Sequence, residues 1–182
     1  WMLVILCAYL SRSTSKKYYS GCTLGWISFS LSQAAAIGLE NYPSVHTLLA
    51  LQMASVGISA IFLFRGSFHI AAEERWGNIL VYMTVPILLW SGFVAFKMPD
   101  RLWPREPVFL FLAGACAYTG LQYYRARKHS HAASILGGAF FLWAVQLVVF
   151  PFLSVSPVLR LLGHIVSAVL TLTIAIGIIV KE

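Results

Sequence analysis

The sequence predicts an all-α membrane protein, a polytopic bundle of transmembrane helices. Of its 182 residues, 59% are apolar and only 10% are charged, and the mean hydropathy is +0.80. A soluble domain carries about 25% charged residues, so this chain lacks the polar surface that a water-exposed fold needs. The apolar residues form continuous runs instead of alternating with polar ones, which is typical of membrane helices and not of barrel strands.

The intervals between charged residues give seven predicted spans, of which the first is incomplete. Pro151 and Pro157 end the sixth span near Leu153, with a short loop to Leu159. We expect residues 1–182 to form a single transmembrane domain, the membrane part of a longer chain. The spans are Trp1–Ser11, Tyr18–Leu39, Asn41–Phe64, Trp76–Phe96, Pro107–Tyr124, Ala132–Leu153 and Leu161–Val180.

The charges between the spans predict the orientation. Nine Lys and Arg residues and three acidic residues fall in the loops and tail of one side, whereas four basic and three acidic residues fall on the other side. Basic residues collect in cytoplasmic loops. The asymmetry therefore predicts an external N-terminus and a cytoplasmic C-terminus. It also explains the net charge of +7 without a nucleic-acid partner.

The chemistry of the spans excludes several classes of protein. The predicted spans from residue 18 onward contain no ionised residue in their interiors, and pumps and proton relays need such groups. No sequence motif of a hydrolase, a metalloprotease or a phosphate-binding loop is present. Cys7, Cys22 and Cys116 lie in apolar runs without paired spacing and are interpreted as small core residues. We therefore expect no catalytic residue and no metal site.

Small residues and aromatic residues have structural explanations. Rows of small residues four positions apart, such as Gly21 and Gly25, predict close helix packing, within one bundle or at a homodimer face. Pro86 predicts a kink in the fourth span. Seven aromatic residues are predicted to lie at the water interfaces, where amphipathic rings settle: Tyr18, Tyr19, Tyr42, Trp76, Trp103, Tyr123 and Tyr124.

Three glutamines suggest a ligand site. Gln33, Gln52 and Gln146 fall in the outer half of their spans, about 10 Å below the outer surface at 1.5 Å per residue. Trp90 and Trp143 lie at a similar depth. An unpaired amide in hydrocarbon is costly, so each glutamine needs a polar partner. Two interpretations remain open: hydrogen bonds between helices, or a pocket with aromatic walls for a small hydrophobic ligand.

Two histidines suggest a second arrangement. His46 and His164 occupy the predicted outer first turns of two spans. Two neutral imidazoles can hold a haem or a metal when their helices touch. We expect no cofactor, because hydrogen bonding in the headgroup region is the main interpretation of both histidines; a haem held by His46 and His164 is the alternative.

The chain resembles the multi-helix N-terminal membrane input regions of bacterial sensor histidine kinases and PAS/GGDEF signalling proteins. At the start, the resemblance rests on the basic turn and aromatic residues of Tyr9–Arg12 and Lys17–Tyr19 and on the Gly-Trp of Leu24–Trp26. Near the end, it rests on Leu142–Gln146 and on the aromatic-proline segment Phe150–Phe152. In that family a histidine is common where Gln146 stands.

The resemblance implies a multi-pass sensor module of a bacterial inner membrane, without catalysis of its own. The last span would pass a stimulus from the outer side or the lipid phase to a cytoplasmic kinase or diguanylate cyclase domain. The main alternative is a non-catalytic accessory subunit of a larger membrane complex, which would have no internal cavity. A redox protein that uses His46 and His164, and a small transporter, are further alternatives.

Overall fold

The computed structural model describes residues 2–14, 17–71, 74–101, 103–125, 131–153 and 157–181, and in these residues the regular structure is helical throughout. Apolar runs form helices in a membrane because each backbone N–H and C=O then finds a partner within its own segment. The helices are α1 (Met2–Thr14), α2 (Lys17–Asn41), α3 (His46–Ile70), α4 (Glu74–Val81), α5 (Thr84–Lys97), α6 (Glu106–Arg125), α7 (His131–Leu153) and α8 (Pro157–Lys181).

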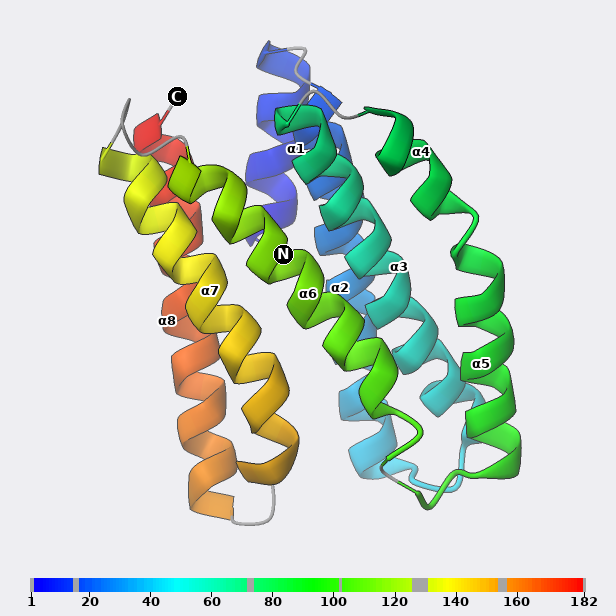
Figure 1. The fold of residues 1–182 in the computed structure, drawn as a ribbon. Helices are drawn as coiled ribbons and strands as arrows, with labels where there is room; N and C mark the ends of the chain where they lie inside the picture. Colours follow the sequence, from blue (N-terminus) through cyan, green and yellow to red (C-terminus); the bar gives the residue numbers. More distant parts are fainter. Residues whose placement is uncertain are drawn as a thin grey trace.

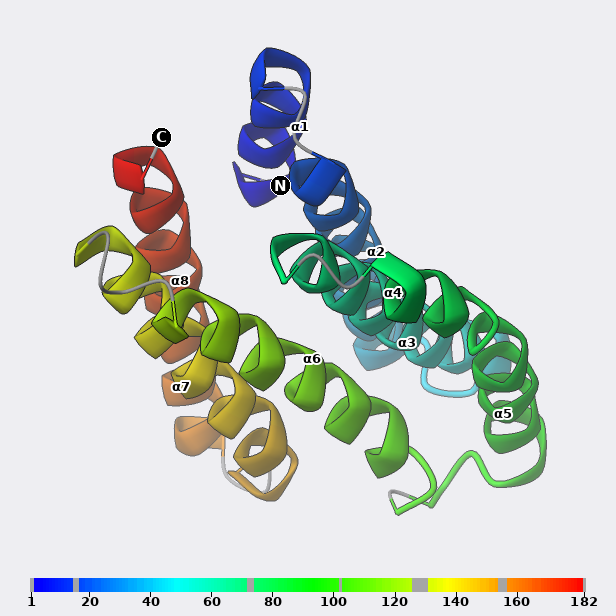
Figure 2. The ribbon, with the colours of Figure 1, turned by 45° about the horizontal axis from the view of Figure 1, so that its top comes forward.

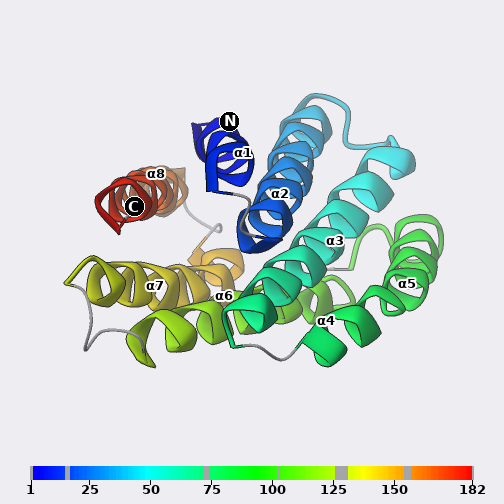
Figure 3. The same ribbon diagram turned by 90° about the horizontal axis from the view of Figure 1, so that it is seen from above.

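The helices form an open ring. Seen from above, α1, α2, α3, α6, α7 and α8 surround the centre, and α4 and α5 lie outside the ring beside α3 (Figure 3). Helix α6 packs on both α3 and α7, so it joins the α1–α5 side to the α7–α8 pair (Figure 2). Between α1 and α8 the contact is slight. The ring is therefore tightly packed everywhere except on the α1–α8 side.

Four helical segments in the described part of the chain are long and apolar enough to cross a membrane: Tyr18–Asn41, His46–His69, Ile79–Lys97 and His131–Val149. Met2–Ser13 and Ile165–Val180 are shorter apolar helices. These findings confirm an all-helical, membrane-type bundle, whereas seven complete crossings stay a prediction. Helix α6 is less apolar because its second half carries Thr119, Gln122 and Tyr123, which it buries against neighbouring helices.

Pro86 coincides with a break between α4 and α5. The helix stops at Val81, turns through Tyr82 and Met83, and resumes at Thr84. Pro86 has no N–H for the carbonyl of Tyr82 four residues before it, and its ring clashes with that carbonyl. The predicted kink is confirmed, and it is a full interruption of the helix.

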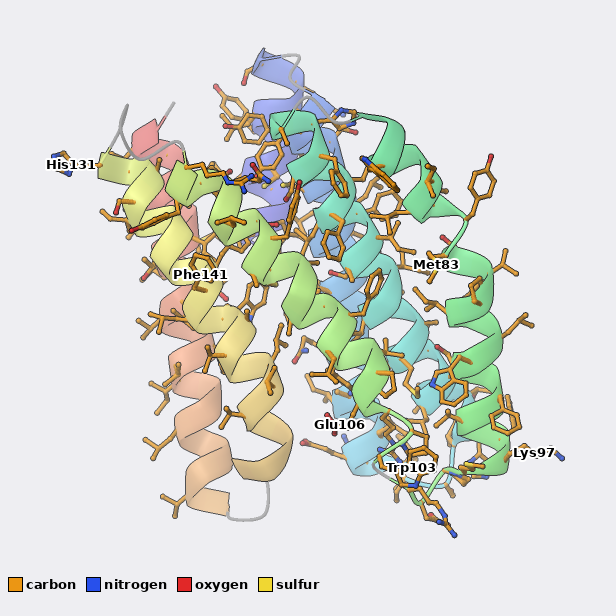
Figure 4. The ribbon with its side chains drawn as sticks, viewed as in Figure 1. Met83, Lys97, Trp103, Glu106, His131 and Phe141 are labelled. Atoms are coloured by element: carbon orange, nitrogen blue, oxygen red, sulfur yellow. The ribbon has the colours of Figure 1, made fainter. Side chains whose placement is uncertain are left out.

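The connections alternate between the two ends of the bundle. The carboxyl ends of α1, α3, α6 and α8 lie at the same end of the bundle, the top in Figure 1. Lys97, Trp103 and Glu106 lie at the bottom, opposite His131 (Figure 4). This alternation agrees with the grouping of basic and acidic residues in the sequence. Which end faces the cytoplasm stays a prediction.

The small residues of α2 lie at its contact with α3. A Cβ atom on Gly21 would lie 3.2 Å from the Cα atom of Gly66, and one on Gly25 would lie 3.2 Å from the Leu63 side chain. A Cβ at either position would be tighter than an ordinary contact, so glycine favours this close approach of the two helices. At these two positions the small residues pack inside a single bundle.

Three of the predicted interface aromatics point inward instead. Tyr18, Tyr19 and Tyr123 are buried between helices, whereas Tyr42, Trp76, Trp103 and Tyr124 are exposed. The place of a residue within an apolar run indicates its depth along the helix axis, but it does not indicate which face of the helix carries the residue. The three buried tyrosines contribute to the packed interior, and the depth of all seven aromatic residues in the membrane stays a prediction.

Candidate functional site

A cleft of about 500 Å³ opens between α1, α2 and α8. Helix α1 occupies only the upper half of the bundle in Figure 1, and its first residues line the cleft together with the second half of α2 and the middle of α8. Ligand pockets commonly have volumes of about 300–1,000 Å³. The cleft is lined by Leu3, Val4, Trp26, Phe29, Ser30, Gln33, Ala34, Ile37, Ser167, Ala168 and Thr171.

The inner wall of the cleft is a stack of aromatic rings. Trp26 lies parallel to Trp143 of α7, with ring centroids 4.7 Å apart and an interplanar angle of 7°. Phe29 meets Trp143 edge to face at 5.1 Å. Both tryptophans are almost fully buried, at 4% and 2% exposure. Such pairs contribute about 0.5–1.5 kcal/mol beyond their burial, so the wall is a rigid link between α2 and α7.

Polar groups line the cleft on two of its helices. Helix α2 contributes Ser30 and Gln33, and α8 contributes Ser167 and Thr171. The Thr171 hydroxyl donates to the Ser167 carbonyl of its own helix at 2.8 Å. The Gln33 side chain is exposed, so its amide has room to bind a polar group of a ligand. An apolar cleft with a few hydrogen-bonding groups suits a small molecule that is mostly hydrophobic.

Helix α8 is fixed to α7 at two levels. Gln146 Nε2 donates to the Gly163 carbonyl at 2.7 Å, while its Oε1 is buried without a hydrogen-bond partner. Further along, a Cβ on Gly177 would lie 2.8 Å from the Leu136 side chain. Helix α8 thus has a firm contact with α7 on one side and the cleft on another.

The structure brings some of the predicted site residues together and separates others. Gln33 lines the cleft, and Trp143 supports its wall through Trp26. Gln146 lies in the contact between α7 and α8. Gln52 lies half-buried on α3, outside the cleft.

Trp90 of α5 does not line the cleft and instead contacts the connection from α5 to α6. Its Nε1 donates to the Pro104 carbonyl at 2.9 Å. In the same connection Arg105 donates to the Pro99 carbonyl. Burial lowers the pKa of the Arg105 guanidinium, and the nearby Asp100 carboxylate partly counteracts this. Trp90 therefore serves to anchor this loop.

His46 and His164 lie on helices with different neighbours. The exposed His46 ring faces Phe96 of α5, with centroids 6.1 Å apart. His164 is part of α8, which packs on α7 and touches α1, and its side chain lies outside the described residues. The haem hypothesis gains no support from these positions and stays a prediction.

The sequence analysis missed Trp26 and Phe29 of α2 and the polar residues of α8. The sequence signal for Trp26 is its position in mid-span, because tryptophans of membrane helices usually lie at the water interfaces. No comparable signal marks Ser167 or Thr171, because serine and threonine are ordinary in membrane helices.

Comparison of the chain with protein-family models, with curated proteins and with solved structures gave no match.

Proposed function

We propose that the chain is a membrane-embedded sensor module of a bacterial signalling protein, in which α8 passes a stimulus to a cytoplasmic output domain of the histidine kinase or diguanylate cyclase type. The observation that carries the proposal is the position of the cleft, since α8 is one of its walls. A molecule that occupies the cleft contacts α8 directly. Movement of α8 then shifts the carboxyl end of this helix, where the output domain of this proposal begins.

The ligand in this proposal is a small hydrophobic molecule that enters from the lipid phase and uses Gln33 for a polar contact. Such a ligand shifts the conformational equilibrium only if it binds one arrangement of α8 better than the other. Because the α1–α8 contact is slight, an adjustment of α8 on this side disrupts little packing. Helix shifts of about 1–2 Å are typical of such signals.

The accessory-subunit hypothesis predicts a bundle without an internal cavity. A cleft of about 500 Å³ with a polar lining on two helices favours the sensor over that alternative.

The proposal is tested by filling the cleft with a side chain. Ala168 lines the cleft, whereas its neighbour Val169 is 57% exposed and does not line it. We expect Ala168→Trp to displace α8 and Val169→Trp to leave it in place, because only the first tryptophan competes with α2 for space. Both variants carry the same tryptophan side chain, at adjacent positions of the same helix, so Val169→Trp is the control for the presence of a tryptophan on α8.

The measurement is the distance between spin labels at Ser20→Cys on α2 and Ile179→Cys on α8, both exposed positions, by double electron–electron resonance in nanodiscs. The three native cysteines are buried and react slowly with the label. The expected result is a shift of about 1–2 Å in the Ala168→Trp variant alone. Identical distances in both variants and the parent would contradict the relay through α8.

A further inference from the structure

The cleft between α1, α2 and α8 carries its polar groups far from both ends of the bundle. Ser30 and Gln33 lie in the middle part of α2, and Ser167 and Thr171 lie in the middle part of α8, both helices of 25 residues. A helix of that length spans about 38 Å, and the hydrocarbon core of a bilayer is about 30 Å thick. In a membrane these groups therefore lie within the hydrocarbon region, and a molecule that reaches them comes from the lipid phase.

The lining of the cleft carries no charge in the described part of the chain. It consists of apolar residues with two serines, one threonine and one glutamine. A carboxylate or a phosphate bound there would have no cationic partner among these residues. An unpaired charge in hydrocarbon costs far more than a neutral polar group. The cleft therefore favours a neutral ligand over a fatty acid or the headgroup of a phospholipid.

The hydrogen-bonding groups of the cleft suit a ligand that both donates and accepts. The Thr171 hydroxyl donates its only hydrogen to the Ser167 carbonyl at 2.8 Å, so its oxygen can only accept a bond from a ligand. The exposed amide of Gln33 can donate one. A ligand hydroxyl matches both groups, because it donates to Thr171 and accepts from Gln33. An ester or a ketone only accepts, so it is limited to the bond with Gln33.

We propose that the cleft binds a neutral lipid alcohol, a molecule with a hydroxyl group and a hydrocarbon tail. This inference rests on the proposed function and names the class of ligand for the same cleft. The hydroxyl lies between Gln33 and Thr171, and the tail packs on the apolar part of the lining, which includes Leu3, Phe29 and Ile37. Because its two polar partners belong to α2 and α8, the bound hydroxyl links these helices across the cleft.

The test is photoaffinity labelling of the chain in nanodiscs with hexadecanol that carries a diazirine in its tail. Labelled peptides are identified by mass spectrometry, and we expect them to come from the parts of α1, α2 and α8 that line the cleft. Unlabelled hexadecanol should compete with the probe. Methyl palmitate should compete about 2- to 10-fold less well, because it lacks one hydrogen bond, and palmitic acid at a pH where it is ionised should compete least. Equal competition by all three molecules would overturn the inference, and so would labelling confined to other helices.

A matched pair of variants tests the contact with the hydroxyl. Thr171→Val and Thr173→Val each remove a hydroxyl that donates to the carbonyl four residues before it at 2.8 Å, but only Thr171 lines the cleft. We expect Thr171→Val to raise the probe concentration for half-maximal labelling about 2- to 10-fold and to abolish the preference for the alcohol over the ester. Thr173→Val should change neither quantity. Equal behaviour of the two variants would refute the contact.

The result can be separated from that of the α8 relay. Alcohol-selective labelling together with an unmoved α8 in the Ala168→Trp variant would support the ligand class and contradict the relay. A displaced α8 in that variant, together with labelling that shows no preference for the alcohol, would support the relay and contradict the ligand class.

Discussion

A close backbone contact between α6 and α7 predicts different effects for substitutions at two adjacent glycines. A Cβ atom on Gly137 would lie 3.0 Å from the Gly120 carbonyl oxygen and 3.2 Å from the backbone nitrogen of Tyr124. These are backbone atoms of a packed helix, so they cannot move aside as a side chain can. A Cβ on Gly138 would meet nothing within 4 Å. We therefore expect Gly137→Ala to destabilise the bundle and Gly138→Ala to leave it intact.

The expected magnitude follows from two opposing terms. Alanine in place of a helical glycine gains about 1 kcal/mol of helix propensity, and this gain is the same at both positions. Overpacking a close contact costs about 1–3 kcal/mol, and only Gly137→Ala incurs that cost. The difference in the free energy of unfolding between the two variants should therefore be about 1–3 kcal/mol, with Gly137→Ala the less stable.

The assay is reversible unfolding in mixed micelles of a mild detergent and dodecyl sulfate, followed by circular dichroism. Far-ultraviolet circular dichroism reports the loss of helix in both variants equally. The two variants are compared with each other, and their substitutions lie at adjacent positions, so the absolute free energy of unfolding is not needed. Equal stabilities, or a more stable Gly137→Ala variant, would show that the backbones of α6 and α7 lie further apart than these Cβ distances require.

Two further predictions concern contacts across the ring of helices. Replacing Trp143 with alanine should lower the free energy of unfolding by about 3–5 kcal/mol in the same assay, because it removes the stack with Trp26 and leaves a cavity; a loss below about 1 kcal/mol would contradict a buried stack. The hydroxyls of Ser67 on α3 and Thr119 on α6 lie 2.6 Å apart, and a double-mutant cycle with Ser67→Ala and Thr119→Val should give a coupling energy of about 0.6 kcal/mol, at most about 1.7. A coupling energy of zero would show that the two hydroxyls do not interact.

The sequence determined the elements of this fold far better than their lateral arrangement. Apolar runs between charges located the long helices, and Pro86 marked the break between α4 and α5, because both signals are local. The faces of the helices could not be assigned in this way. Helices α2 and α7 carry apolar residues almost uniformly around their axes, so periodicity could not indicate which side is buried.

For the candidate site, too, the sequence predicted the depth of residues along their helices but not the helices that they face. Depth alone grouped Gln33, Gln52 and Gln146 as equivalent, yet Gln33 lines the cleft, Gln146 bonds to α8, and Gln52 lies half-buried on α3 away from the cleft. Residues at the same depth therefore make different contacts, depending on the helix that each of them faces.

The most direct test of inward signalling is the orientation of the two ends of the bundle. Asp100 is exposed in the connection between Lys97 and Trp103, and His131 is exposed at the opposite end of the bundle (Figure 4). A membrane-impermeant maleimide can distinguish the two ends as Asp100→Cys and His131→Cys in intact spheroplasts. A cytoplasmic carboxyl end of α8 requires that Asp100→Cys reacts at once and that His131→Cys reacts only after the membrane is permeabilised. Labelling of His131→Cys in intact spheroplasts, with Asp100→Cys protected, would place the end of α8 outside and contradict a signal passed to the cytoplasm.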